Sequence, residues 1–123
     1  MTAELLFSKD HEWVRVVSDG VAVVGVTDYA AEQLGDVVYV DLPESGDEIS
    51  AGSEMGEIES TKSVSDLFSP ISGTVSEINP AVVDTPELVN SSPFDEGWLL
   101  KASFDALPED LLSAEDYKAF TAS

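Results

Sequence analysis

A pair of strand-like segments that meet at a polar tip most constrains how this chain can fold. Residues 55–60 alternate in character, with glutamates on one face and an isoleucine on the other, and a second apolar segment covers residues 64–68. Such period-two alternation is typical of β-strands. Between the segments lies a hydrophilic run, residues 60–63, that holds Lys62. The pattern therefore predicts a β-hairpin with a solitary cation at its tip.

Short apolar segments of the same kind recur along the chain and are separated by turn residues. Asp19-Gly20 is a strong hairpin signal, because the central positions of the tightest hairpin turns need positive φ. Gly25 lies inside an apolar segment and suggests a bulge or a close backbone approach. Residues 79–93 contain several prolines and are expected to be mostly irregular. Besides the two strands around Lys62, strands are predicted over residues 12–18, 21–26, 37–41, 47–49, 74–78 and 98–103.

Helices are expected only at the edges of this pattern. Thr27 or Asp28 can begin the first helix, and Gly35 can end it. Ser113 can begin the last helix. Short strands at close spacing with peripheral helices predict a mainly β fold, a small barrel or sandwich that forms one domain over residues 1–123. The expected helices cover residues 29–34, 109–112 and 114–122.

The charge balance excludes several classes of function. Five Lys and Arg residues stand against 25 Asp and Glu residues, which gives a net charge of −20. A nucleic-acid-binding protein needs a basic surface to neutralise phosphates, and anionic lipid headgroups would repel this chain. We therefore expect neither nucleic acid nor membrane as a partner. The acidity itself has two readings that stay open, namely solubility and electrostatic steering toward basic partner surfaces.

The scarcity of catalytic side chains is equally informative. The chain has no cysteine and a single histidine, so it can form no disulfide, no thiolate metal site and no multi-histidine metal site. We expect no metal and no catalytic residues, and hence no enzyme activity. Residues 1–7 lack the basic and apolar regions of a signal peptide, so we expect a cytoplasmic protein. The oligomeric state stays open, with a monomer as the simplest expectation.

Lys62 admits several interpretations from the residues alone. It could be an ordinary solvated lysine of a turn, as most such lysines are. It could also be an attachment point, because it is isolated and has Gly46 and Gly73 at fixed offsets on either side. A Schiff-base lysine is disfavoured, since that chemistry needs a buried amine and this tip is hydrophilic. An acidic interaction domain without a prosthetic group stays open as a function of another class.

A set of short segments, spread over almost the whole chain, carries a resemblance. The segments are, in order, Asp10-His11-Glu12-Trp13, Gly25-Val26-Thr27-Asp28, Gly35-Asp36 with Val37 to Pro43, Glu59-Ser60-Thr61-Lys62, Ser65-Asp66, Ser69-Pro70-Ile71-Ser72-Gly73, Leu88-Val89-Asn90 and Gly97-Trp98-Leu99. Together they resemble the H protein of the glycine cleavage system. Biotinyl carrier domains, which usually flank the lysine with methionines, and the shorter lipoyl domains of other complexes match less well.

The resemblance implies a fold, a cofactor and partners. The fold is a barrel-sandwich hybrid like that of lipoyl and biotinyl carriers, with short peripheral helices that include a C-terminal one. Lipoic acid would be attached in amide linkage to Lys62. The partners would be the glycine decarboxylase (P protein), the aminomethyltransferase (T protein), the dihydrolipoyl dehydrogenase (L protein) and the lipoate-attaching enzymes. The chain would carry an aminomethyl group derived from glycine between them, and would not be an enzyme itself.

The resemblance also implies roles for acidic residues around the lysine. In the family the loaded arm folds back into a cleft, where the acid that matches Glu12 is a contact. Asp10 and Asp66 are further candidates for contacting the arm. Glu59, like Asp66, lies close to the lysine and is either a solvated edge residue or a recognition point for the lipoate-attaching enzymes. Gln33 stands where family members often have histidine, so no titrating role is expected there.

Overall fold

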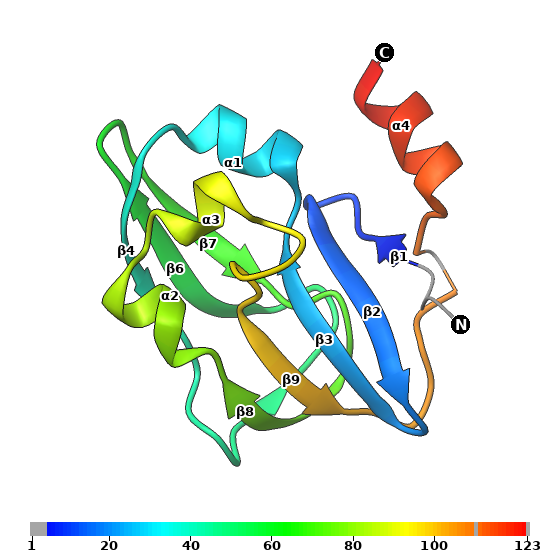
Figure 1. Ribbon diagram of the computed structural model, residues 1–123. Coiled ribbons are helices and arrows are strands. Elements are labelled where there is room, and N and C mark those ends of the chain that lie inside the picture. The colour runs from blue at the N-terminus through cyan, green and yellow to red at the C-terminus, as the bar shows by residue number, and fades with distance from the viewer. Residues whose placement is uncertain (1–4, 110, 123) are drawn as a thin grey trace.

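The computed structural model describes residues 5–109 and 111–122, and these form two antiparallel sheets with short helices around them (Figure 1). The larger sheet has the strand order β1-β2-β3-β9-β8-β5 and the smaller one has the order β4-β6-β7. The strands of the larger sheet are, in that order, Leu5–Phe7, Glu12–Ser18, Val21–Val26, Leu100–Ser103, Gly73–Ile78 and Glu48–Ile49. The strands of the smaller sheet are Val37–Asp41, Glu54–Ser60 and Val64–Phe68.

The main hydrophobic core lies between the sheets and binds them together. Val26 of the larger sheet meets Val40, Ile58 and Leu67 of the smaller one in a single cluster of buried side chains. Burial of such side chains is the main favourable contribution to folding. Among the described strands the two sheets stay separate, so the expected barrel-sandwich hybrid is confirmed without a closed barrel.

Three short helices complete one side of this core. They are α1 (Asp28–Leu34), α2 (Pro80–Asp84) and α3 (Leu88–Ser91), which contribute the buried residues Ala31, Val82 and Val89 respectively. The fourth helix, α4 (Ala114–Ala122), lies apart from them beside β1 (Figure 1). None of the helices in the described residues is both long and apolar enough to cross a membrane.

An aromatic cluster attaches α4 to the edge of the larger sheet. Trp13 is fully buried, and its indole nitrogen donates to the Pro93 carbonyl at 2.9 Å. Gly25 pairs with Trp13 across β2 and β3, and a Cβ at Gly25 would lie 2.5 Å from Trp13 Cε2. The close approach expected at Gly25 is thus confirmed. Phe7 of β1 stacks on Tyr117 of α4 with ring centroids 4.6 Å apart.

The structure corrects the sequence-based prediction in four places. The strand β1 was not predicted, and the expected strand over residues 98–103 begins only at Leu100. Residues 79–93 contain α2 and α3 rather than mainly irregular chain. The expected helix over residues 109–112 is wrong in its described part, because Leu112 forms a β-bridge with Phe7 instead. Residues 1–4, 110 and 123 lie outside the described residues.

Candidate functional site

The tip of the β6–β7 hairpin is fastened by Ser60. The Ser60 amide donates to the Ser63 carbonyl at 2.8 Å, and the Ser60 hydroxyl donates to the same oxygen at 3.2 Å. The hydroxyl oxygen also accepts from the amides of Lys62 and Ser63, each at 3.2 Å. Ser60 is buried while Lys62 is exposed, so the backbone beneath the lysine is fixed and its side chain is accessible.

The tip also rests on the loop that follows α1. The Thr61 amide donates to the Asp36 carbonyl at 3.0 Å. Asn90 of α3 holds this loop from the other side, since its side-chain amide donates to the Gly35 carbonyl at 2.7 Å and its side-chain oxygen accepts from the Val37 amide at 2.9 Å. The hairpin tip, the end of α1 and α3 therefore form one hydrogen-bonded unit beneath Lys62.

The aliphatic stem of Lys62 lies across Gly35. A Cβ at Gly35 would lie 3.0 Å from Lys62 Cε and 3.4 Å from Cδ, and the backbone there has a φ of 82°. Both the contact and the left-handed conformation favour glycine at this position. The lysine stem is thus directed along the C-terminal end of α1 rather than straight away from the hairpin.

A cleft of about 400 Å³ opens beside the hairpin tip. It lies between the start of β2, the helix α1 and the strand β7, so three distant parts of the chain build it. Its walls combine apolar side chains with carboxylates and hydroxyls. The lining residues are Asp10, His11, Glu12, Val26, Tyr29, Ala30, Gln33, Leu34, Ile58, Ser63, Ser65, Asp66 and Leu67.

Glu12 is the buried acid of this cleft. Its residue is only 3% exposed, and the Ser8 hydroxyl donates to Glu12 Oε1 at 2.7 Å. Burial raises the pKa of Glu12 from 4.5 to about 8, although the bonds from Ser8 and from the Phe68 amide oppose the shift. The carboxyl is therefore mostly protonated near neutral pH, and a cation in the cleft would favour its ionised form.

The cleft brings together three of the four acidic candidates and separates the fourth. Asp10 and Asp66 are exposed lining residues and Glu12 is buried, so the cleft has one desolvated acid among hydrated ones. Glu59 is not among the lining residues. It is an exposed residue of β6 that pairs with Tyr39 on one side and Val64 on the other. Gln33 also lines the cleft, where its amide can form hydrogen bonds.

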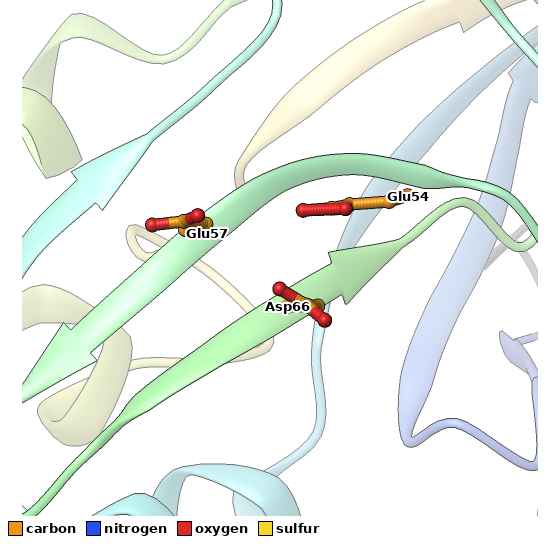
Figure 2. Close-up of side chains that lie close together, drawn as sticks. All are labelled: Glu54, Glu57 and Asp66. Carbon is orange, nitrogen blue, oxygen red and sulfur yellow. The ribbon is translucent and has the colours of Figure 1, made fainter.

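A group of carboxylates lies further along the β6–β7 hairpin. Figure 2 shows Glu54 and Glu57 on β6 and Asp66 on β7, and an oxygen from each lies within 4.8 Å of the others. All three side chains are exposed. The charge of Asp66 is the main cause of a raised pKa at Glu54. Like charges in neighbouring strands repel each other, so this arrangement weakens the hairpin slightly.

The roles of several site residues could not be predicted from the sequence. Ser60 and Asn90 were noted only as parts of segments with a family resemblance, and their roles as hydrogen-bonding residues depend on contacts with residues 63 and 35–37. Tyr29 lines the cleft without any motif of its own, and Ser65, which also lines it, was noted only as part of the Ser65-Asp66 segment. Only Thr27 had a usable signal, because it was expected to begin α1, and its hydroxyl does accept from the Ala30 amide.

Comparisons with known proteins identify relatives that span nearly the whole chain. The model of the glycine cleavage H-protein family matches residues 5–123. The glycine cleavage system H protein of Streptomyces coelicolor is 56% identical over 117 residues, 95% of this chain and 94% of the relative. That of Clavibacter sepedonicus is 58% identical over 115 residues, 94% of this chain and 92% of the relative.

A solved structure gives the same answer at the level of the fold. The crystal structure of a glycine cleavage system H protein from Mycobacterium marinum has a TM-score of 0.92 and 41% sequence identity, with all of both chains covered. The sequence match and the structural match therefore agree over the same region. This chain belongs to the glycine cleavage H-protein family.

Proposed function

We propose that this chain is the lipoyl-bearing carrier of a glycine cleavage system, with lipoic acid attached to Lys62. Family membership supports the role of carrier protein, which moves an aminomethyl group derived from glycine from a decarboxylase to an aminomethyltransferase and then meets a dehydrogenase. The attachment to Lys62 rests on one observation: an exposed lysine at a fixed hairpin tip lies beside a cleft that holds a buried acid.

The residues around Lys62 fit an attached lipoyl group. A primary amine forms a stable amide, and the exposure of Lys62 leaves it accessible to a lipoate-attaching enzyme. When bound, lipoic acid supplies a dithiolane whose sulfur accepts the aminomethyl group and later returns to the disulfide form. The hydrogen bonds of Ser60 hold the attachment point still while the rest of the arm can move. This arrangement delivers one group to several active sites at high effective concentration.

The cleft protects the cargo between visits. Its apolar walls, including Val26, Leu34 and Leu67, keep water away from the loaded end of the arm. The aminomethyl amine is a cation, and Glu12 offers it a desolvated carboxylate partner. Glu12 would be protonated in the absence of a cation and would lose its proton to solvent on pairing with the amine. Asp10 and Asp66 would contact the arm at the exposed rim.

The proposal includes partners, location and domain structure. The P, T and L proteins follow from family membership, and the lipoate-attaching enzymes must reach Lys62, with Glu59 beside the tip as a recognition point. The chain acts as a monomer without catalytic activity of its own. The relatives named above are bacterial, which supports the cytoplasm as its location. The family match over residues 5–123 supports one lipoyl-carrier domain over the whole chain.

Mass spectrometry tests the attachment directly. The full chain is incubated with lipoate, ATP and a lipoate ligase, digested, and searched for a lipoyl mass increment on the Lys62 peptide. Lys62→Arg is the matched control, since it keeps the charge and removes the acylatable amine. We expect the increment on wild type alone. An increment on another lysine, or none on Lys62, would contradict the proposal.

A further inference from the structure

His11 has an unusual backbone in the wall of the cleft. With a φ of 69° it is the only residue other than glycine at positive φ among those described, and it lies between Asp10 and Glu12. For an L-residue this left-handed conformation is unfavourable because Cβ approaches the backbone. Such a conformation persists only where surrounding contacts impose it, and it is frequent at functional sites. The contacts that hold His11 therefore also decide where the neighbouring acids lie.

Backbone contacts account for part of this restraint. The His11 amide donates to the Ser8 carbonyl at 3.1 Å, and the His11 carbonyl accepts from the Thr27 amide at 3.0 Å. Glu12 extends the same turn, since its carbonyl accepts from the Ser8 amide at 2.8 Å. These bonds fasten the turn to β1 and to the start of α1. They leave the His11 side chain to be held separately.

The side chain is held by a hydroxyl from the C-terminal helix. The Tyr117 hydroxyl oxygen lies 2.8 Å from His11 Nδ1 and 2.8 Å from Thr27 Oγ1. When the neutral His11 ring carries its proton on Nε2, Nδ1 accepts from the Tyr117 hydroxyl. The Tyr117 oxygen can then accept from the Thr27 hydroxyl, whose oxygen also accepts from the Ala30 amide. Burial lowers the pKa of His11, against the opposing charge of Asp10, which favours the neutral ring that can accept this bond.

Packing around the imidazole comes from the same helix and from α1. The Tyr29 ring lies 4.8 Å from the His11 ring, and the Phe120 ring lies 6.0 Å from it. Tyr117 itself is buried and stacks on Phe7 of β1. The helix α4 contributes no residue to the lining of the cleft. Through Tyr117 it nevertheless contacts His11, which lies between the cleft acids Asp10 and Glu12.

We propose that Tyr117 is a positioning residue for the acidic wall of the cleft: its hydroxyl holds His11 in the left-handed conformation that places Asp10 and Glu12 in the cleft. Without this bond, the turn can relax toward negative φ, which rotates the chain immediately before Glu12. The Glu12 side chain then leaves its desolvated position beside Ser8. The consequence for the loaded arm rests on the proposed function of Glu12 in binding the aminomethyl amine.

Three variants of the unlipoylated full chain test the mechanism. Tyr117→Phe removes the hydroxyl and keeps the stack on Phe7. His11→Ala removes the hydrogen-bond acceptor and keeps the cost of a left-handed Cβ. His11→Gly also removes the acceptor, but glycine adopts positive φ without that cost. Two NMR measurements report on this part of the cleft. The titration midpoint of the Glu12 carboxyl reports its burial, and the hydrogen-exchange rate of the Thr27 amide reports its bond to the His11 carbonyl.

The three variants have different expected results. Tyr117→Phe and His11→Ala should lower the Glu12 midpoint by about one pH unit, because the carboxyl gains solvation. Both should speed exchange of the Thr27 amide roughly 3- to 10-fold, as expected for loss of one hydrogen bond. His11→Gly should stay close to wild type in both measurements. An unchanged midpoint and exchange rate in Tyr117→Phe, or a His11→Gly variant perturbed as much as His11→Ala, would overturn the proposal.

Experiments on the lipoylated protein with its aminomethyl group distinguish the positioning role of Tyr117 from the proposed function of Glu12, on which its consequence for the arm rests. If Tyr117→Phe shifts Glu12 in the unlipoylated chain and also shortens the lifetime of the aminomethyl group on the arm, both stand. If Tyr117→Phe shifts Glu12 but neither it nor Glu12→Gln changes that lifetime, the positioning role stands and the proposed role of Glu12 fails. The measurement on the unlipoylated chain decides the role of Tyr117 in either case.

Discussion

Glu12 combines two properties that a solvated acid cannot have together. Its burial keeps it protonated near neutral pH, and the same burial strengthens its attraction to any cation that reaches the cleft. Asp10 and Asp66 at the exposed rim attract a cation from a distance but hold it less strongly, because water screens them. On the proposed function, the cleft would therefore favour an arm that ends in a cation over an arm without one.

Neutralising Glu12 tests its role toward the cargo. We expect Glu12→Gln to shorten the lifetime of the aminomethyl group on the lipoylated protein roughly tenfold or more, because a charged hydrogen-bond partner is lost. Release of formaldehyde and ammonia over time measures the lifetime. Glu57→Gln is the matched control, since Glu57 is an exposed carboxylate of the β6–β7 hairpin that does not line the cleft. Equal lifetimes in Glu12→Gln and wild type would refute the role.

The raised pKa of Glu12 predicts that the stability of the fold depends on pH, and Glu12→Gln serves as the reference protein. In the folded chain the pKa of Glu12 is about 8, against an ordinary value of 4.5. Between these values the folded state holds a proton that the unfolded state has released, so stability is full below about pH 4.5 and falls as pH rises through 8. Wild type should thus lose about 1.4 kcal/mol per pH unit relative to Glu12→Gln within this window.

Urea unfolding of both proteins at a series of pH values between 5 and 8 measures this difference. The Gln side chain has no titrating group, so groups common to both proteins cancel in the comparison. A difference in unfolding free energy that stays constant over the series would mean that Glu12 is ionised in the fold. If wild type instead gained stability relative to Glu12→Gln as pH rises, the result would contradict the raised pKa that burial predicts.

For single residues, the sequence predicted which side chains belong to the site better than it predicted their surroundings in the fold. The solitary Lys62 and the acid Glu12 could both be found from short segments, because a motif records residue types. The buried state of Glu12 could not be found, since it depends on Ser8 and on the Phe68 amide, which approach only in the folded chain. The left-handed His11 had no signal either, because the residue is held by Tyr117, 106 positions away in the sequence.

Among the secondary-structure elements, the β6–β7 hairpin and α3 together hold Lys62 in place. The hairpin supplies Lys62, and α3 supplies Asn90, whose side chain holds the loop on which the tip rests. The strands were predictable because their alternation is a local property, and the boundaries of β2, β3 and β4 agree with the prediction. The helix α3 was not, because it spans four residues and has no side-chain hydrogen bond at its N-cap.

Removing the Asn90 side chain should affect both stability and attachment. We expect Asn90→Ala to lower the unfolding free energy by about 1–3 kcal/mol, because the Gly35 carbonyl and Val37 amide lose their partner. We also expect slower acylation of Lys62 by a lipoate ligase, roughly tenfold, since the amine is presented less uniformly. Urea unfolding and a time course of the lipoyl mass increment provide the two measurements.

Asn79→Ala is the matched control for this experiment. The Asn79 side chain likewise bridges backbone groups, donating to the carbonyls of Glu96 and Trp98, both at 2.8 Å. It should lose similar stability while leaving acylation of Lys62 close to wild type, because its contacts lie away from the hairpin tip. If both variants slowed acylation equally, the effect would follow from general destabilisation and not from the support beneath the tip.

The whole molecule is strongly anionic, with a net charge of −20. Such a field raises the rate of encounter with basic surfaces more than it raises affinity. Attractive steering is consistent with a carrier that must leave one partner before it meets the next. The crowded carboxylates of Glu54, Glu57 and Asp66 contribute to this field beside the hairpin.

Salt dependence distinguishes steering from mere solubility. If the charge serves association, the on-rate for binding to the aminomethyltransferase should fall roughly tenfold or more between about 0.05 and 0.5 M salt. The off-rate should change much less. Stopped-flow or surface-based kinetics at several salt concentrations measures both rates. An on-rate independent of salt would leave solubility as the sufficient reason for the acidity.

The position of the Lys62 stem has a consequence for the freedom of the attached arm. Because the stem lies across Gly35, the first bonds of an arm attached to Lys62 would have a preferred direction, and its far end would sample part of the surrounding space. Less conformational entropy is then lost when that end settles on the protein's own surface. Gly35 would thus influence how often a lipoyl arm on Lys62 returns to the protein's own surface, through the conformation of its attachment point.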